Sequence, residues 1–325
     1  MLHVQVILLF ALVLLHDVAA GAGIVPETPQ SWALLLVGVI IPYATLAAVA
    51  FASGRVAERT LLRLADGLSG HSDQQAARIV GRTLVKLDRR LALVRILSLI
   101  HTAACILVVG WLDAIRSLIG DAILIDEFLA LAPPVLLLAL EYAARYPVER
   151  VVHDARVLSA LDEGLPIYPT PSRWAYISMQ VRHNLLLVIV PLGLALTWSE
   201  VIATGMRWID TWAKAHIEHS VSAGSPSTTD SLARWSLVVL EDPNIASLTY
   251  TLFQFGGVLV MFAFLPVLLR RVWSTQPLGD SPLRTKLTVM CDHARVKVAD
   301  VLIWRTGGWM INGAVLGIIG RARYI

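Results

Sequence analysis

The residue types that could hold a metal ion gather in one segment, AKAHIEH at residues 213–219. His216, Glu218 and His219 bring imidazole and carboxylate groups together in it, and residues three apart on a helix can share an ion. The spacing differs from HExxH, in which two histidines at i and i+4 bind zinc and the intervening glutamate activates water. His216 also falls on the apolar face of the predicted helix. The three residues are therefore metal candidates, with a solvated helix end as the alternative.

Three further ionisable side chains, His101, Glu141 and Glu200, lie within or close to long apolar runs. Such residues are functional candidates by default, because a charged group inside a membrane is costly. Glu141 and Glu200 stand near the ends of their runs, where they could reach lipid headgroups. His101 could be neutral and hydrogen-bonded between helices. A structural and a functional role stay open for each of them.

The composition indicates a membrane protein. The chain of 325 residues is 56% hydrophobic and only 16% charged, with a mean hydropathy of +0.67. Soluble domains average roughly 45–50% apolar and about 25% charged residues, so the lipid bilayer is the expected partner and nucleic acid is not. Cys105 and Cys291 stand far apart and are interpreted as free thiols. The glycines fit neither a dinucleotide-binding nor a P-loop spacing.

Five apolar runs are long enough to cross a membrane as helices, for which about 20 residues are needed. They are residues 32–53, 91–112, 128–146, 184–203 and 247–269. The run at 128–146 contains Pro133 and Pro134, which a membrane helix tolerates only where neighbouring helices cover the freed carbonyls. The sequence therefore predicts a mainly α fold with a polytopic membrane domain at residues 32–271.

Residues 1–20 are ambiguous. Their apolar core VQVILLFALVLL and the small residues after it are typical of a signal peptide, yet the first fifteen residues contain no lysine or arginine. We favour a retained first helix, which raises the number of spans to six, and keep a cleaved signal peptide as the alternative.

Lysine and arginine predict the orientation, because cytoplasmic connections carry the excess of positive charge. The connections 54–90 and 147–183 and the tail from Arg270 are rich in these residues, whereas 113–127 and the outer loop 204–246 are poor in them. We therefore expect both termini in the cytoplasm and a bacterial inner membrane as the location.

Two connections have predicted helices of their own. Residues 54–90 are expected to form two helices around the break GLSGHSDQQ, where Ser72 and Gln75 have capping-box spacing. Their positive face could bind anionic lipid or serve only to set the topology. Residues 204–219 are expected to form an amphipathic helix on the outer surface, followed by the flexible stretch SAGSPSTTDS.

Beyond the last span the pattern changes to that of a soluble segment. SPLRTKLTVMCDHA predicts a helix with Ser281 as its N-cap and Pro282 in its first turn. Leu283, Leu287 and Met290 give this helix an apolar stripe. RVKVADVLIW and MINGAVLGI predict two strands separated by the turn RTGGW, and RARYI begins a third. The chain is therefore expected to end in a short cytoplasmic segment of helix and strands.

This order of elements behind a polytopic membrane region resembles the integral-membrane zinc metallopeptidases of the HtpX and CAAX prenyl protease type. In that family a helix, a strand and a turn precede a strand with an Asn-Ala pair and a downstream glycine. A further strand then leads to the helix that bears HExxH. The matching residues are Trp304-Arg305-Thr306, Asn312-Gly313-Ala314, Gly317 and Arg321-Ala322-Arg323-Tyr324-Ile325. Gly313 departs from the pattern, because it separates Asn312 from Ala314. The likeness covers residues 283–325.

The resemblance implies a zinc-dependent endopeptidase that cuts membrane or misfolded proteins, with Asn312, Gly313, Ala314 and Gly317 beside the substrate cleft. In that family the histidines of HExxH and a downstream glutamate bind zinc. None of the nine histidines here forms this motif. We therefore expect residues 272–325 to be the truncated start of a peptidase-like domain. The chain is expected to hold no cofactor and to be inactive alone, with the catalytic segment encoded downstream or supplied by a separate chain.

The alternative is a non-enzymatic polytopic membrane protein, either a transporter or channel subunit or a scaffold. A transporter should bring polar residues from several helices together near mid-membrane, and in this sequence only His101 lies there. The coding sequence past Ile325 distinguishes the two hypotheses, because the peptidase predicts an HExxH-bearing segment there.

Overall fold

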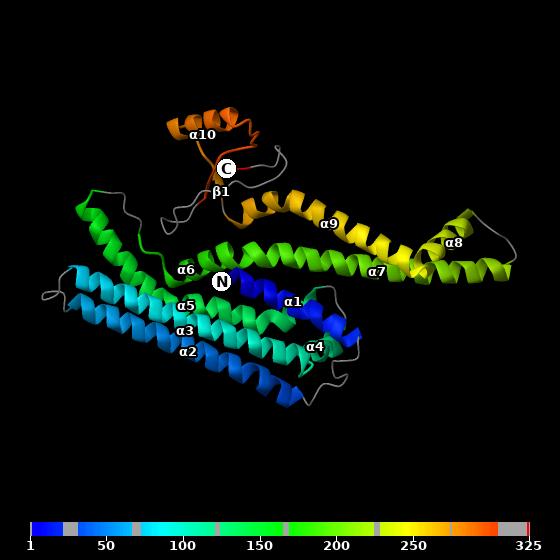
Figure 1. Cartoon of the computed structure of the whole chain (residues 1–325), viewed down its shortest axis with the longest axis horizontal. Coiled ribbons are helices and arrows are strands. Elements are labelled where there is room, and N and C mark those ends of the chain that lie inside the picture. Colours follow the sequence, from blue (N-terminus) through cyan, green and yellow to red (C-terminus); the bar gives the residue numbers. More distant parts are fainter. Residues whose placement is uncertain are drawn as a thin grey trace. The chain divides into compact units, whose positions relative to one another are not determined.

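A computed structural model describes residues 2–21, 32–66, 73–120, 124–164, 169–223, 228–273, 275–304 and 324. The fold is mainly α, as the sequence predicts (Figure 1). The helices are α1 (Leu2–Gly21), α2 (Trp32–Asp66), α3 (Asp73–Leu107), α4 (Trp111–Ile119), α5 (Ile125–Asp162), α6 (Arg173–Gln180), α7 (Leu186–Ala223), α8 (Thr228–Glu241), α9 (Pro243–Val272) and α10 (Pro282–His293). A π-helical turn at Val181–Leu185 joins α6 to α7, and the strands are β1 (Thr275–Pro277) and β2 (Leu302–Trp304). The chain forms two compact units, unit 1 (Met1–Ile189) and unit 2 (Val190–Trp304 with Tyr324).

Among the described residues, five helical segments are long and apolar enough to cross a membrane. They are Leu35–Ala65, Ala77–Leu107, Ile125–Asp162, Arg173–His219 and Asn244–Val272, and each overlaps one of the predicted apolar runs. The protein is therefore an integral membrane protein. The apolar part of α1, His3–His16, is shorter than these segments, so the sixth span stays a prediction.

Helices α2, α3 and α5 are longer than a bilayer requires. They have 35, 35 and 38 residues, which at 1.5 Å per residue is roughly 52–57 Å against a hydrocarbon core of about 30 Å. The surplus length falls in the arginine-rich connections, which form the basic end of unit 1. The prediction of two helices within 54–90 is confirmed, because α2 continues to Asp66 and α3 starts at Asp73. Ser72, the proposed cap, lies outside the described residues.

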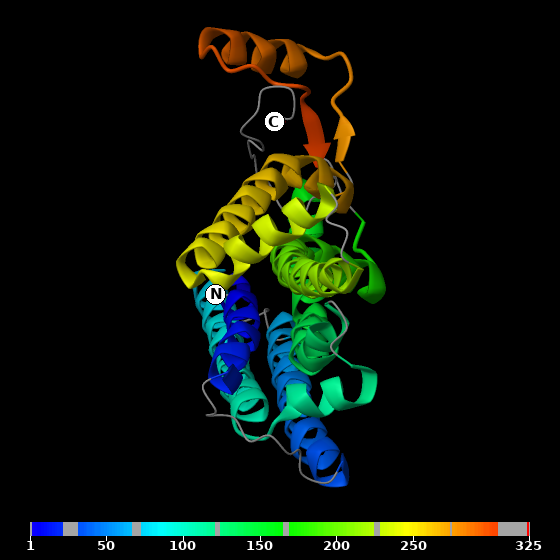
Figure 2. The same ribbon diagram turned by 90° about the vertical axis from the view of Figure 1, so that its right-hand side faces the viewer.

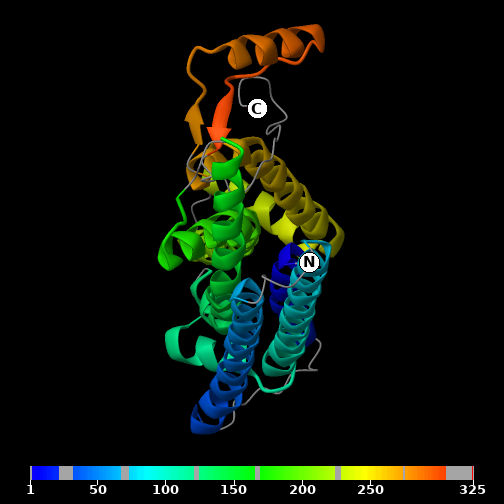
Figure 3. The same cartoon turned by 90° about the vertical axis from the view of Figure 1, so that its left-hand side faces the viewer.

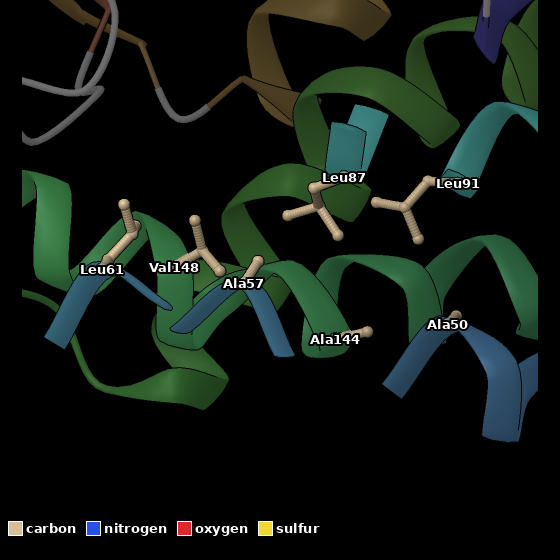
Figure 4. Close-up of a cluster of buried hydrophobic side chains, with 7 residues drawn as sticks. All are labelled: Ala50, Ala57, Leu61, Leu87, Leu91, Ala144 and Val148. Atoms are coloured by element: carbon tan, nitrogen blue, oxygen red, sulfur yellow. The ribbon is translucent and has the colours of Figure 1, made fainter. Parts of the chain in front are cut away.

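An apolar core joins α2, α3 and α5 near the basic end. Its buried members are Ala50, Ala57, Leu61, Leu87, Leu91, Ala144 and Val148 (Figure 4). Small residues let α2 and α5 approach closely, since a Cβ atom at Gly54 would overlap the backbone carbonyl of Ala144. Helix α1 packs alongside α3 (Figure 3). Unit 1 therefore has an interior of its own.

The predicted span at 91–112 ends earlier than expected. Helix α3 stops at Leu107, and α4 begins after Gly110, whose φ of 73° places it in the left-handed region. Glycine enters this region without the steric penalty that other residues meet, so the chain turns there. Helix α5, by contrast, continues unbroken through Pro133, Pro134 and Pro147. Helices α2, α3 and α4 pack along it, which meets the condition for membrane prolines.

The connection predicted at 204–246 is helical over most of its described residues, including part of the stretch predicted to be flexible. The predicted amphipathic helix at 204–219 is confirmed as part of α7, which continues to Ala223, and α8 begins at Thr228. The stretch SAGSPSTTDS is thus helical on both sides of residues 224–227, which lie outside the described residues. Serine, threonine and aspartate favour turns, but they also favour the first positions of helices.

The segment after α9 contains the predicted helix and part of the predicted strands. Helix α10 begins after Ser281, as expected. The strand expected over RVKVADVLIW is limited to β2, which pairs antiparallel with the unpredicted β1 (Figure 2). The strand predicted over MINGAVLGI lies outside the described residues. Of RARYI, Tyr324 forms an isolated parallel bridge with Asp300.

Candidate functional site

The C-terminal platform, which we define as β1, α10 and β2 (residues 275–304), begins directly after the last membrane helix. Thr275 pairs with Trp304, Gln276 with Ile303 and Pro277 with Leu302. Each strand has only three residues, and an isolated pair of strands is marginally stable in water. Further contacts must therefore hold this platform together.

Helix α10 owes its start to its own sequence. The Ser281 hydroxyl accepts a hydrogen bond from the Arg284 backbone N–H at 3.2 Å, and Pro282 occupies the first turn, where a missing N–H costs nothing. The Arg284 guanidinium donates to Asp300 at 2.9 Å and also to the carbonyl of Leu278. One side chain thus joins α10 to the segments before and after it.

Two aromatic contacts tie the end of α9 to the platform and to Tyr324. The indole rings of Trp273 and Trp304 stack with their centroids 4.7 Å apart. The Arg270 guanidinium lies 5.3 Å from the centre of the Tyr324 ring, within the range of a cation–π interaction. Residues at the end of the last span therefore fix the position of β2.

Two surfaces of this region could bind a partner. Of the predicted apolar stripe on α10, Leu283 and Met290 are exposed and Leu287 is half-buried, and Val289 is exposed beside them. A cavity of about 450 Å³ is lined by Val267, Arg270, Arg271 and Thr275 at the end of α9. Its two arginines suit an anionic group such as a lipid phosphate.

The predicted metal candidates lie on α7 without forming a site. His216 stacks on the indole of Trp212 with centroids 5.3 Å apart, while Glu218 and His219 are exposed. Within the described residues, no group of three or more His, Cys, Asp or Glu side chains is placed to hold a metal ion. The metal hypothesis for these residues therefore stays a prediction without geometric support. The predicted cleft residues Asn312, Gly313, Ala314 and Gly317 lie outside the described residues.

Glu141 occupies a different environment from the expected one. Instead of reaching lipid headgroups it is 2% exposed, and it accepts a hydrogen bond of 2.6 Å from the Arg95 Nε atom. An ion pair inside a membrane protein neutralises two charges that lipid cannot solvate. Sequence analysis missed this pair, although Arg95 lies within the second predicted span. Glu200 is half-buried on α7.

His101 lies inside the bundle, as expected. Its Nε2 atom is 3.4 Å from the Cys105 thiol and 3.4 Å from the Val39 carbonyl, and its ring meets that of Tyr43 edge-on. Tyr43 in turn shares a 2.6 Å hydrogen bond with Thr102. Several polar groups of α2 and α3 thus meet within the spans, whereas the sequence indicated only His101 there. Cys105 and Cys291 are both free thiols.

The far end of unit 1 carries a second group of buried charges. Arg116 of α4 donates to Asp126 at 2.7 Å and to Glu127 at 2.9 Å at the start of α5. His16 of α1 lies 2.9 Å from Asp113 of α4. These contacts connect three helices where the sequence predicted only the start of a span.

The fold and these buried contacts define a polytopic helical membrane protein with a small C-terminal platform. No protein-family model, no curated protein and no solved structure matches the chain.

Proposed function

We propose that the chain is the membrane-anchoring part of a zinc-dependent membrane endopeptidase, located in a bacterial inner membrane with both termini in the cytoplasm. The order of elements after the last span carries the proposal. Helix α10 starts at its Ser281 cap, β2 follows, and Tyr324 bridges back to Asp300. This order of a helix followed by a strand is the described part of the order that underlies the resemblance of residues 283–325 to the HtpX and CAAX prenyl protease type.

In this proposal the chain supplies anchorage and positioning and does not carry out hydrolysis. The residues present do not fit a zinc site, since the sequence contains no HExxH and no described group of side chains could hold the metal. The metal ligands then belong to a segment encoded downstream or to a separate chain. The Trp273–Trp304 stack would keep the start of the peptidase domain close to the membrane, where membrane or misfolded proteins are its substrates.

The test is to read the DNA past the codon for Ile325, in every frame and in the adjacent reading frame. We expect an HExxH-bearing segment there. The chain joined to that segment, in lipid nanodiscs, should bind stoichiometric zinc and cleave an unfolded protein, and exchanging the motif glutamate for glutamine should abolish cleavage while zinc stays bound. Unrelated sequence at that place, or a joined protein that binds zinc and cleaves no unfolded protein, would contradict the proposal.

A second candidate function, a transporter or channel subunit or a scaffold, is favoured by the polar contacts inside unit 1. Arg95 and Glu141 form an ion pair between α3 and α5, and ionisable groups within spans often mark an ion or substrate pathway. Arg95 and Glu141 neutralise each other's charge, which a purely structural role also explains. Ion flux through liposomes containing the chain, lost on replacing both residues with leucine, would favour this candidate over the peptidase anchor.

A further inference from the structure

The cavity of about 450 Å³ at the end of α9 lies where this membrane helix meets β1, and Val267, Arg270, Arg271 and Thr275 line it. Among these described lining residues there is no acidic side chain, so the cavity carries two positive charges. The segment Asn244–Val272 has 29 residues, which is roughly 43 Å of helix and matches a bilayer with its headgroup layers. The two arginines therefore lie at the depth of the lipid phosphates.

Both guanidinium groups keep their N–H donors for a ligand. The Arg270 guanidinium lies 5.3 Å from the centre of the Tyr324 ring, a contact that orients the side chain without giving its N–H groups an acceptor. Arg271 is exposed. Within the described part of the chain, neither guanidinium makes an ion pair or a hydrogen bond. Two cations without a counter-charge select a ligand that is negatively charged, and guanidinium geometry suits a phosphate.

The segment after α9 fixes the backbone beside these arginines. The Thr275 hydroxyl donates to the Arg270 carbonyl at 3.1 Å, and Thr275 pairs with Trp304 in the sheet. Trp304 in turn stacks on Trp273. Because the chain around the cavity is held by these contacts, less conformational entropy is lost when a ligand binds there.

An exposed apolar stripe leads from the cavity along the membrane helix. Val260, Phe264 and Val267 are exposed, and their spacing of four and three residues places them on one face of α9. Arg271 follows four residues after Val267 and continues the same face. A ligand held by its phosphate at the arginines therefore has room for an acyl chain beside it, which favours a phospholipid over a free phosphate.

We propose that this cavity binds an anionic phospholipid whose headgroup carries no cation, the chemistry of phosphatidylglycerol. The phosphate oxygens accept from the guanidinium groups of Arg270 and Arg271, and an acyl chain lies along Val267 and Phe264. Zwitterionic lipids carry the same phosphate, but their ammonium group brings a positive charge close to the two arginines. The charge of the cavity lining therefore selects the anionic headgroup.

Lipid retention by the purified full chain tests the proposal. The delipidated chain in detergent would be offered phosphatidylglycerol, phosphatidylethanolamine and phosphatidylcholine with identical acyl chains, and native mass spectrometry would count the bound lipid. Because each basic residue near a membrane surface attracts anionic lipid severalfold, phosphatidylglycerol should be retained roughly five- to thirtyfold more strongly than either zwitterionic lipid. Equal retention of the three lipids would overturn the proposal.

Inorganic phosphate distinguishes a lipid from a soluble ligand. Calorimetric titration of the same chain with inorganic phosphate, at an ionic strength kept constant with sodium chloride, should show no saturable binding at millimolar concentration. Saturable binding of inorganic phosphate that displaces phosphatidylglycerol would assign the cavity to a soluble phosphate and overturn the proposal.

Charge variants locate the preference in the cavity. Arg271→Gln removes one charge from an exposed side chain and should lower the retention of phosphatidylglycerol about fivefold. The double variant Arg270→Gln with Arg271→Gln should erase the preference. Arg89→Gln with Arg90→Gln is the matched control, because these residues also form an exposed arginine pair beside an apolar run but do not line the cavity. An equal loss in both double variants would show a general attraction between basic residues and anionic lipid, and would overturn the proposal.

One further variant separates the cavity from its charges and covers the case in which the arginine variants fail to fold. Val267 lines the cavity, so Val267→Trp fills the space while both arginines stay in place. This variant should elute from size exclusion like the unaltered chain and lose most of its preference for phosphatidylglycerol. An undiminished preference in the folded variant would show that the lipid binds elsewhere.

Discussion

In unit 1, 50% of the most apolar stretch of α5 is buried inside the protein, whereas in unit 2 the corresponding share of α9 is 17%. Unit 1 also contains the Arg95–Glu141 ion pair and the close approach of Gly54 to Ala144. Unit 2 instead exposes Leu252, Phe255, Leu259 and Phe262 of α9. The difference teaches that α5 is held mainly by contacts with the other helices of unit 1, while α9 leaves most of its apolar surface to lipid.

The largest expected loss of stability comes from breaking the Arg95–Glu141 ion pair of unit 1. Glu141→Leu leaves the Arg95 charge without its partner inside the membrane, which should lower the free energy of unfolding by about 3–5 kcal/mol. Denaturant unfolding in detergent would measure the loss. The double variant Arg95→Leu with Glu141→Leu is the control and should recover most of the stability. A single variant as stable as the unaltered chain would show that the pair does not hold unit 1 together.

The second effect concerns the close approach of α2 to α5. Gly54→Ala places a Cβ atom against the Ala144 carbonyl, a backbone group that cannot move without shifting α5. The expected loss of stability is about 1–3 kcal/mol. Gly81→Ala is the matched control, since no atom lies within 4 Å of its added Cβ; it should instead stabilise α3 by up to about 1 kcal/mol. Equal effects of the two substitutions would argue against tight packing in unit 1.

The third effect tests the anchoring of the platform in unit 2. Trp304→Ala removes the stack on Trp273, a contact worth about 1 kcal/mol. Proteolysis within residues 275–304 should then become about fivefold faster. The protease cuts the open form of the platform, and the variant populates that form more. Trp235→Ala, on an exposed ring of α8, should leave that rate unchanged. If both variants are cleaved at the rate of the unaltered chain, the stack does not secure β2.

The smallest effect is expected where α7 meets α9. A Cβ atom at Gly257 would overlap the indole of Trp198, but this ring is only half-buried and can move toward lipid. Gly257→Ala should therefore cost less than Gly54→Ala, under about 1 kcal/mol, while Gly256→Ala meets no atom within 4 Å. Thermal unfolding of the Gly257→Ala and Gly256→Ala variants would measure the difference in their stability. If Gly257→Ala loses as much stability as Gly54→Ala, the packing of α7 on α9 is as tight as that of α2 on α5, and the contrast drawn above is wrong.

Local patterns predicted the features that depend on neighbouring residues. The apolar runs located the spans, and Ser281 followed by Pro282 located the start of α10, because a cap and a proline act within one turn. Gly110 follows the early end of the second span. A glycine is a local signal for a helix end, but the prediction gave more weight to the uninterrupted apolar run at 91–112.

Contacts between distant residues were not predictable in the same way. Arg95 and Glu141 are 46 positions apart, and nothing in either apolar run says which helices will be neighbours. Strand β1 was not predicted, because three residues ending in Pro277 are too few to show an alternating pattern. Likewise, nothing near Gln5 in the sequence indicates that its side chain donates to the Arg95 carbonyl of α3.

The most direct measurement of the proposed role is the zinc content and peptidase activity of the purified chain by itself in nanodiscs. A chain that anchors a peptidase without carrying its metal ligands should retain no stoichiometric zinc and should cleave no unfolded protein. Bound zinc at one ion per chain, together with cleavage that a chelator abolishes, would contradict this assignment.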